Sequence, residues 1–202
     1  MTYIFDLGGV LVDLNSKKAA VQFKHLLSIP TLLRGRDFIK REVKVLFKEY
    51  EKGTYTTDEF ARLFCKRCHP WVTRKHVLRW WTSILLGLPE ERKQAIRKLK
   101  AEGHQVYLLS NTSEIHWQYC LDHFFAGEDI NDYFDRLFLS YEIGIRKPDQ
   151  SIYEYVIEKT GCNPAETVYF DDLPANIEGG LKAGLQAKQV IGNEWIELCC
   201  HE

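Results

Sequence analysis

The sequence comprises 202 residues, of which 45% are hydrophobic and 27% charged, with a formal net charge of −1. This is the balance of an ordinary globular protein, and the length suffices for one α/β domain with an inserted subdomain. A near-neutral charge gives no electrostatic argument for a nucleic-acid or membrane partner, and no window approaches the roughly 18 apolar residues of a membrane span. An expected strand close to the start leaves no room for a cleavable signal peptide, so we expect a cytoplasmic protein, monomeric or weakly dimeric.

The first predicted element is a short apolar strand at residues 3–5, followed at once by Asp6 and the pair Gly8-Gly9. An apolar run with a turn behind it is typical of a strand buried on both faces of a parallel sheet. Residues 15–88 have a different sequence pattern, in which Leu, Phe and Val recur at helical spacing with lysines and arginines between them. The expected helices of this block span residues 17–27, 37–50, 57–64 and 74–85.

Two of the six cysteines form a local pattern, since residues 65–69 read C-x-x-C-H. This is the signature of c-type haem attachment, and the same residues could bind zinc. Haem attachment requires an exported chain, and the segment ends an expected helix where Cys serves as a small apolar residue. We therefore favour coincidence over haem or zinc, and reduced thiols over a disulfide framework.

After residue 88 the pattern changes to helices alternating with strands. A helix is expected from Pro89 to Gly103. The expected strands that follow are 105–109, 136–139, 167–170 and 187–191, and the expected helices are 113–125, 151–159 and 175–183. Such alternation predicts an α/β fold with a doubly wound parallel sheet. The sequence thus predicts an α/β core of residues 1–14 and 89–202 with an inserted all-helical cap of residues 15–88.

Polar residues follow four of the predicted strands or lie in the loops beyond them. They are Asp6, Ser110, Asn111, Lys147, Asp171 and Asp172. Each has an ordinary explanation when taken alone, as a helix cap, a turn residue or a surface acid. Ligands of doubly wound sheets bind at the carboxyl ends of the strands, however, so these side chains are expected to converge at one edge.

Three acids and a lysine at one edge favour a divalent cation that carries a phosphate. Carboxylate and phosphate oxygens are ligands that Mg²⁺ prefers. A carboxylate nucleophile and a phosphate dianion repel each other, and Mg²⁺ with Lys147 would cancel that repulsion. Ser110 and Asn111, expected at a helix start, would offer hydrogen-bond donors to the same phosphate.

The segments 5–11, 109–111, 144–148 and 170–176 resemble the four motifs of the haloacid dehalogenase-like hydrolase superfamily. The resemblance covers nearly the whole chain, and residues 15–88 match the position of that superfamily's cap. It implies that Asp6 is a nucleophile that forms an aspartyl-phosphate. It also implies that Asp6, the backbone carbonyl of Gly8, Asp171 and Asp172 bind Mg²⁺. By the same resemblance Lys147 and Ser110 bind the phosphate and Asn111 lies beside the substrate.

One position departs from the phosphatases of this superfamily, which usually carry a second aspartate two residues after the nucleophile. Gly8 occupies that position here. The missing aspartate would act as general acid, a role typically worth about 10²–10⁴-fold in rate. Either the leaving group needs little protonation, as in an anomeric sugar phosphate, or another group such as Asp13 supplies the proton.

The resemblance favours a Mg²⁺-dependent phosphatase for small phosphate monoesters. The Asp-Leu-Gly form of the first motif resembles a subgroup that includes bacterial α-D-glucose-1-phosphate phosphatases, so sugar phosphates are the first substrate expectation. Two alternatives remain open. One is a non-catalytic protein that binds phosphate esters, and the other is a haloacid dehalogenase, which would not require the adjacent acids Asp171 and Asp172.

Overall fold

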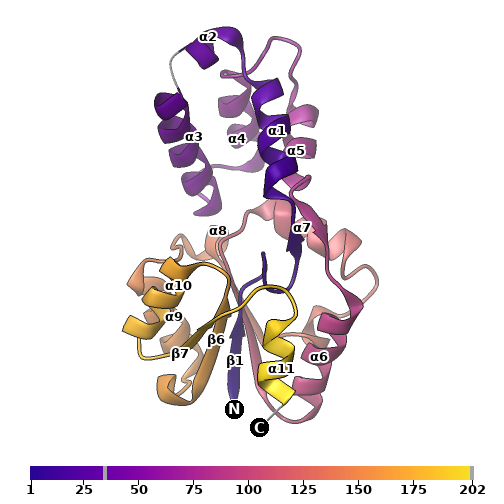
Figure 1. Cartoon of the computed structure of the whole chain (residues 1–202), viewed down its shortest axis with the longest axis vertical. Helices are drawn as coiled ribbons and strands as arrows, with labels where there is room; N and C mark the ends of the chain where they lie inside the picture. Colours follow the sequence, from indigo (N-terminus) through magenta and orange to yellow (C-terminus); the bar gives the residue numbers. More distant parts are fainter. Residues whose placement is uncertain (34–35, 201–202) are drawn as a thin grey trace.

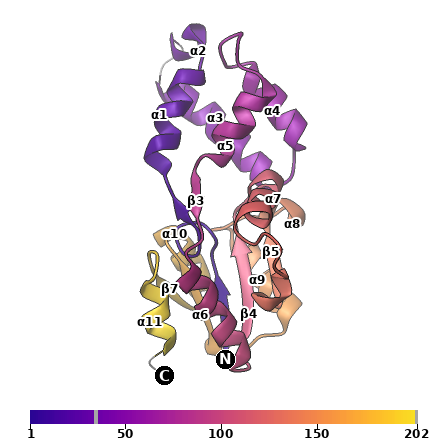
Figure 2. The same ribbon diagram turned by 90° about the vertical axis from the view of Figure 1, so that its right-hand side faces the viewer.

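The computed structural model describes residues 1–33 and 36–200, with the side chains of these residues except 32–40 and 200. A parallel sheet covered by helices forms one end of the molecule, and a group of helices forms the other (Figure 1). A view from the side shows the same two groups following each other along the long axis of the molecule (Figure 2).

The sheet has five strands in the order β5-β4-β1-β6-β7, and all neighbouring strands run parallel. They are β1 (Thr2–Phe5), β4 (Gln105–Ser110), β5 (Arg136–Leu139), β6 (Thr167–Asp171) and β7 (Gln186–Gln189). The predicted doubly wound α/β fold is confirmed. Because β1 is central, its carboxyl end lies between the carboxyl ends of β4 and β6.

Helices cover both faces of this sheet. One face packs against α6 (Glu90–Ala101), α7 (Glu114–His123) and α11 (Glu194–Cys200) in an apolar cluster that includes Phe5 and Trp195. The other face packs against α9 (Gln150–Thr160) through residues such as Ile4 and Tyr153. Helix α10 (Pro174–Lys182) contacts β6, β7 and α9. Two short helices, α8 (Ser140–Ile143) and the 3-10 helix η1 (Ile130–Asp132), flank β5, and a second 3-10 helix, η2 (Pro164–Glu166), precedes β6.

The inserted helices have an apolar cluster of their own. They are α1 (Ser16–Leu26), α2 (Ile29–Leu33), α3 (Arg36–Glu51), α4 (Thr57–Cys65) and α5 (Arg74–Thr82). Aromatic rings dominate the cluster, and the rings of Tyr50 and Phe60 stack with centroids 4.1 Å apart. Cys68 packs in this cluster as a small residue whose thiol donates to the Phe64 carbonyl, and burial raises its pKa to about 12.

The connection between the two groups is a short antiparallel ribbon of β2 (Asp13–Leu14) and β3 (Leu85–Gly87). The sequence did not predict this ribbon. The expected helix 74–85 ends at Thr82 because residues 85–87 pair with β2, and the Asn15 N–H donates to the Ile84 carbonyl at 2.8 Å. Among the helices in residues 1–33 and 36–200, not one combines the length and apolar character that crossing a bilayer requires.

Candidate active site

Asp6 follows the last residue of β1, and its backbone N–H donates to the Phe170 carbonyl at 2.9 Å. The chain then turns sharply, because the N–H groups of Leu11 and Val12 both donate to the Leu7 carbonyl, at 3.0 and 2.7 Å. This turn fixes the carboxylate at the carboxyl edge of the sheet. The Asp6 side chain is nearly buried, with a residue exposure of 7%.

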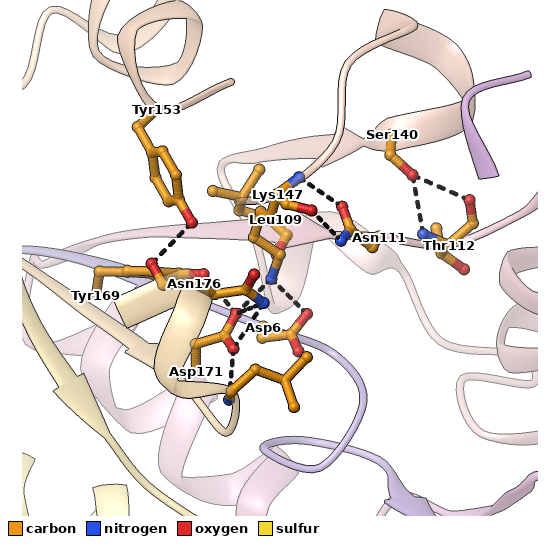
Figure 3. Close-up of polar contacts among 11 residues, drawn as sticks. Asp6, Leu109, Asn111, Thr112, Ser140, Lys147, Tyr153, Tyr169, Asp171 and Asn176 are labelled. Carbon is orange, nitrogen blue, oxygen red and sulfur yellow. Dashed lines mark hydrogen bonds and ion pairs between the residues drawn. The ribbon is translucent and has the colours of Figure 1, made fainter. Parts of the chain in front are cut away.

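Lys147 lies beside Asp6 and is 1% exposed (Figure 3). Its Nζ is 2.8 Å from Asp6 Oδ1, 2.6 Å from Asp171 Oδ2 and 2.8 Å from the Leu109 carbonyl. An ammonium has three protons to donate, so these three acceptors use all of them. The lysine therefore joins the ends of β1, β4 and β6 at one point.

Asp171, at the end of β6, is fully buried and accepts hydrogen bonds on both carboxylate oxygens. Oδ1 accepts from the Leu173 N–H and from Asn176 Nδ2, both at 2.9 Å. Oδ2 accepts from Lys147, and the Tyr169 hydroxyl also donates to it. This carboxylate is thus held rigidly, and it in turn positions the lysine.

Asp172 differs from its neighbour, since among the described residues no other residue donates a hydrogen bond to its carboxylate. Oxygens of Asp6, Asp171 and Asp172 lie within 4.8 Å of one another, which makes this cluster able to hold a metal ion. Gly9 adjoins the cluster with φ +84°, and a Cβ there would be 2.6 Å from Asp172 Oδ2. A glycine is therefore required for the close approach of this turn to Asp172.

Ser110 ends β4 at the same edge and Asn111 follows it, but the two residues differ in their contacts. Ser110 is buried, and its hydroxyl makes no hydrogen bond to any described residue. Asn111 pairs with the backbone of Lys147, donating to its carbonyl at 2.9 Å and accepting from its N–H at 2.8 Å. The amide of Asn111 thus holds the Lys147 loop, while the Ser110 hydroxyl is available to a ligand.

Burial and charge set the protonation of these groups. Burial raises the pKa of Asp6 to about 7; Lys147 opposes the shift, while Asp171 and Asp172 add to it. Burial also acts to raise the pKa of Asp171, but the Lys147 ammonium more than offsets this and holds it below its usual range. Burial and the Asp171 charge raise the pKa of Asp172. A cation in the cluster would favour the ionised carboxylates, which fits the oxygen-rich donor set.

Neither Gly8 nor Asp13 provides an evident general acid. A Cβ on Gly8 would be 3.0 Å from Leu14 Cδ1, so a larger residue there would press on that side chain. Asp13 lies on β2, where Arg92 Nη1 donates to it at 2.8 Å. Arg92 also donates to the Leu11 carbonyl, so Asp13 belongs to an ion pair that ties the turn to α6.

Several supporting residues escaped the sequence analysis. Tyr169 and Asn176 lie in or beside the fourth motif, so their place in the chain could have suggested them. Ser140 and Glu51 carry no such signal: the Ser140 hydroxyl accepts from the Thr112 N–H at 3.0 Å and lies 2.5 Å from the Glu51 carbonyl. This contact joins residues 89 positions apart and links α3 to the sheet edge.

Comparisons with known proteins agree with this geometry. The sequence model of the family described as haloacid dehalogenase-like hydrolase matches residues 1–184. The D-ribitol-5-phosphate phosphatase of Bacteroides thetaiotaomicron is 31% identical over 195 residues, covering 95% of this chain and 93% of that one.

Solved structures give the same picture. The crystal structure of a HAD family enzyme from Bacteroides thetaiotaomicron has a TM-score of 0.87 at 30% identity, covering 98% of this chain and 97% of that one. A second structure of that enzyme, in complex with magnesium and inorganic phosphate, has a TM-score of 0.83 over 98% of each chain. A HAD-like family hydrolase from Porphyromonas gingivalis has a TM-score of 0.83 at 24% identity, over 100% of this chain and 98% of that one, which supports the fold.

Proposed function

This chain belongs to the haloacid dehalogenase-like hydrolase family, and from that premise we propose that it is a Mg²⁺-dependent phosphatase of small phosphate monoesters, with sugar and polyol phosphates as substrates. The observation that carries this proposal is the contact of Lys147 with both Asp6 and Asp171 beside Asp172. The relative that acts on D-ribitol-5-phosphate supports the substrate class.

Asp6 is the nucleophile in this proposal. A carboxylate oxygen of Asp6 attacks phosphorus, the bond from phosphorus to the ester oxygen breaks, and the alkoxide leaves and takes up a proton from water or from the substrate itself. Water then attacks the phosphorus of the aspartyl-phosphate and releases inorganic phosphate and the free carboxylate. Lys147 and the free hydroxyl of Ser110 bind the phosphate oxygens. One of the three Lys147 contacts must be exchanged for a phosphate oxygen, and the contact to Asp6 is the one that weakens when that carboxylate becomes phosphorylated.

The carboxylate cluster fits a hard divalent cation. Asp6, Asp172 and the backbone carbonyl of Gly8 would hold Mg²⁺, with Asp171 completing the cluster while it positions Lys147. When bound, Mg²⁺ supplies charge neutralisation for the phosphate and for the nucleophile. Asn111 acts as a positioning residue because its amide holds the Lys147 backbone.

Because Gly8 provides no general acid, the substrates that the enzyme can hydrolyse depend on how much protonation their leaving group needs. An anomeric ester such as α-D-glucose-1-phosphate leaves with little protonation. A primary ester such as D-ribitol-5-phosphate needs a proton from water or from the substrate itself. Residues 15–88 form the cap that covers the leaving group. We also propose that the protein is cytoplasmic and that it is a monomer or a weak homodimer.

The test is phosphate release from a panel that contains both of these esters and p-nitrophenyl phosphate, with Mg²⁺ and with EDTA. Asp6→Asn keeps the shape of the side chain and removes the nucleophile. Mg²⁺-dependent turnover that is lost in Asp6→Asn would support the proposal. Asp13→Asn serves as the matched control, since its carboxylate is paired with Arg92 and we expect it to remain active.

Two results would contradict the proposal in different ways. Binding of phosphate esters without turnover would favour the non-catalytic alternative. Release of halide from 2-haloacids without added metal would favour a dehalogenase.

A further inference from the structure

The charge of this chain is divided sharply between its two parts. Residues 15–88 contain 16 of the 27 Lys and Arg residues and 6 of the 28 Asp and Glu residues, which gives a formal charge of +10. Residues 1–14 and 89–202 contain the other 11 and 22, which gives −11. The net charge of −1 hides this division. A basic surface attracts anions that come within about one Debye length of it.

A cavity of about 360 Å³ lies on the side of the cap that faces the core. Ala20 and Phe23 of α1 line one wall, Phe47 and Glu51 of α3 line another, and His116 of α7 contributes from the core. The Glu51 carboxylate is 2.7 Å from Arg146 Nη2, and Arg146 directly precedes Lys147. The cavity therefore adjoins the loop that carries the phosphate-binding lysine.

Exposed lysines flank the lining positions on both helices. Lys17 and Lys24 lie three and four residues from Ala20, and Lys44 lies three residues from Phe47, so each is a neighbour on its helix surface. Lys48 has the same relation to Glu51. Within the described part of the chain, none of these four lysines forms an ion pair, and we call them the lysine rim.

We propose that the lysine rim attracts the phosphate group of the substrate and guides it into the site between cap and core. This inference rests on the proposed function and adds to it the route and the charge of the substrate. The core alone repels a dianion at long range, because residues 1–14 and 89–202 carry a formal charge of −11. Mg²⁺ and Lys147 offset only the charge of the carboxylates at the reaction centre itself. The rim offsets this repulsion before the substrate reaches Lys147, which raises the local concentration of anions.

The experiment compares the wild-type chain with the double variant Lys17→Glu/Lys44→Glu across ionic strength. At low salt we expect KM for a phosphate ester to rise about 10-fold in the variant with kcat unchanged, and the difference to shrink to about 2-fold near 0.3 M salt. Calorimetric binding of inorganic phosphate in the presence of Mg²⁺ should weaken in parallel, which gives a readout that does not depend on turnover.

The matched control is Lys66→Glu/Lys75→Glu, which makes the same charge change at two exposed cap lysines away from the cavity. We expect this control to change KM by less than about 2-fold. Equal changes of KM in the two double variants would overturn the proposal. It would also be overturned if neither salt nor the rim substitutions changed KM and the affinity for phosphate. Failure of the wild type to release phosphate from any ester would instead contradict the proposed function, and the phosphate titration would still test the rim.

Discussion

The core and the cap of this molecule use buried polar and apolar groups in opposite ways. At the carboxyl edge of the core's sheet, Lys147 and Asp171 are buried. The three ammonium protons of Lys147 and both carboxylate oxygens of Asp171 have hydrogen-bond partners. The interior of the cap is an aromatic cluster around Phe60, and the charged side chains described in the cap are exposed or half-buried. The core site therefore depends on particular side chains, because each makes specific polar contacts. The cap depends on apolar volume in its interior and on positive charge at its surface.

The largest effect should come from removing Lys147. Lys147→Met leaves Asp6 and Asp171 buried next to each other without a cation, and breaking a buried ion pair costs about 3–5 kcal/mol. We expect the free energy of unfolding in EDTA to fall by that amount and activity to fall more than about 10³-fold, because phosphate binding and charge stabilisation are lost together. Urea unfolding and phosphate release measure the two. Lost activity with unchanged stability would mean that the network does not hold the core edge together.

A substitution in the cap should lower the free energy of unfolding by a similar amount without lowering kcat. Phe60→Ala removes a fully buried ring that stacks on Tyr50, so we expect a loss of about 3–5 kcal/mol in the free energy of unfolding. Because the ring makes no contact with Asp6 or Lys147, kcat measured well below the melting temperature should stay within about 3-fold of the wild type. A larger drop in kcat would show that cap packing positions the reacting groups.

The core site could be predicted from sequence to a large extent. Short apolar strands followed by polar residues indicate where a parallel sheet ends, so Asp6, Ser110 and Asp171 could be placed at one edge from local patterns alone. The structure brings these residues and Lys147 together as expected.

The remaining contacts depend on tertiary structure that no local pattern carries. That the Asn111 amide holds the Lys147 backbone, for example, follows from no local pattern. The contact of Ser140 with Glu51 and the β2–β3 ribbon both join segments far apart in the chain. The charge division between cap and core is visible in sequence only after the cap boundaries are known, because the two halves cancel in the total.

The junction between cap and core should respond to pH through His116. Its Nε2 is 2.8 Å from the Trp81 carbonyl, its ring stacks on the Trp81 ring, and burial lowers its pKa to about 4. Well above pH 6.5 the histidine is neutral in the folded and unfolded chains, so it contributes no pH dependence. As the pH falls from about 6.5 to 4, the proton binds mainly to the unfolded chain, so the free energy of unfolding falls by about 3 kcal/mol. His116→Gln, compared with the wild type by urea unfolding at pH 7 and pH 4.5, should remove that part of the decrease; an identical decrease in both would rule out this role.

The smallest effect should come from the ion pair that joins the two halves. Glu51→Gln keeps the shape of the side chain but removes the charge that faces Arg146, and both partners are only about one-fifth exposed or less. We expect the free energy of unfolding to fall by about 1–2 kcal/mol, and KM to rise several-fold because the cavity wall loosens. The control is Asp58→Asn, which removes an ion pair with Arg74 that is open to solvent and should cost less than about 0.5 kcal/mol without changing KM. Since Arg146 Nε has no partner among the described residues, the guanidinium depends heavily on Glu51. If both variants leave KM unchanged, the Glu51–Arg146 ion pair does not shape the substrate site.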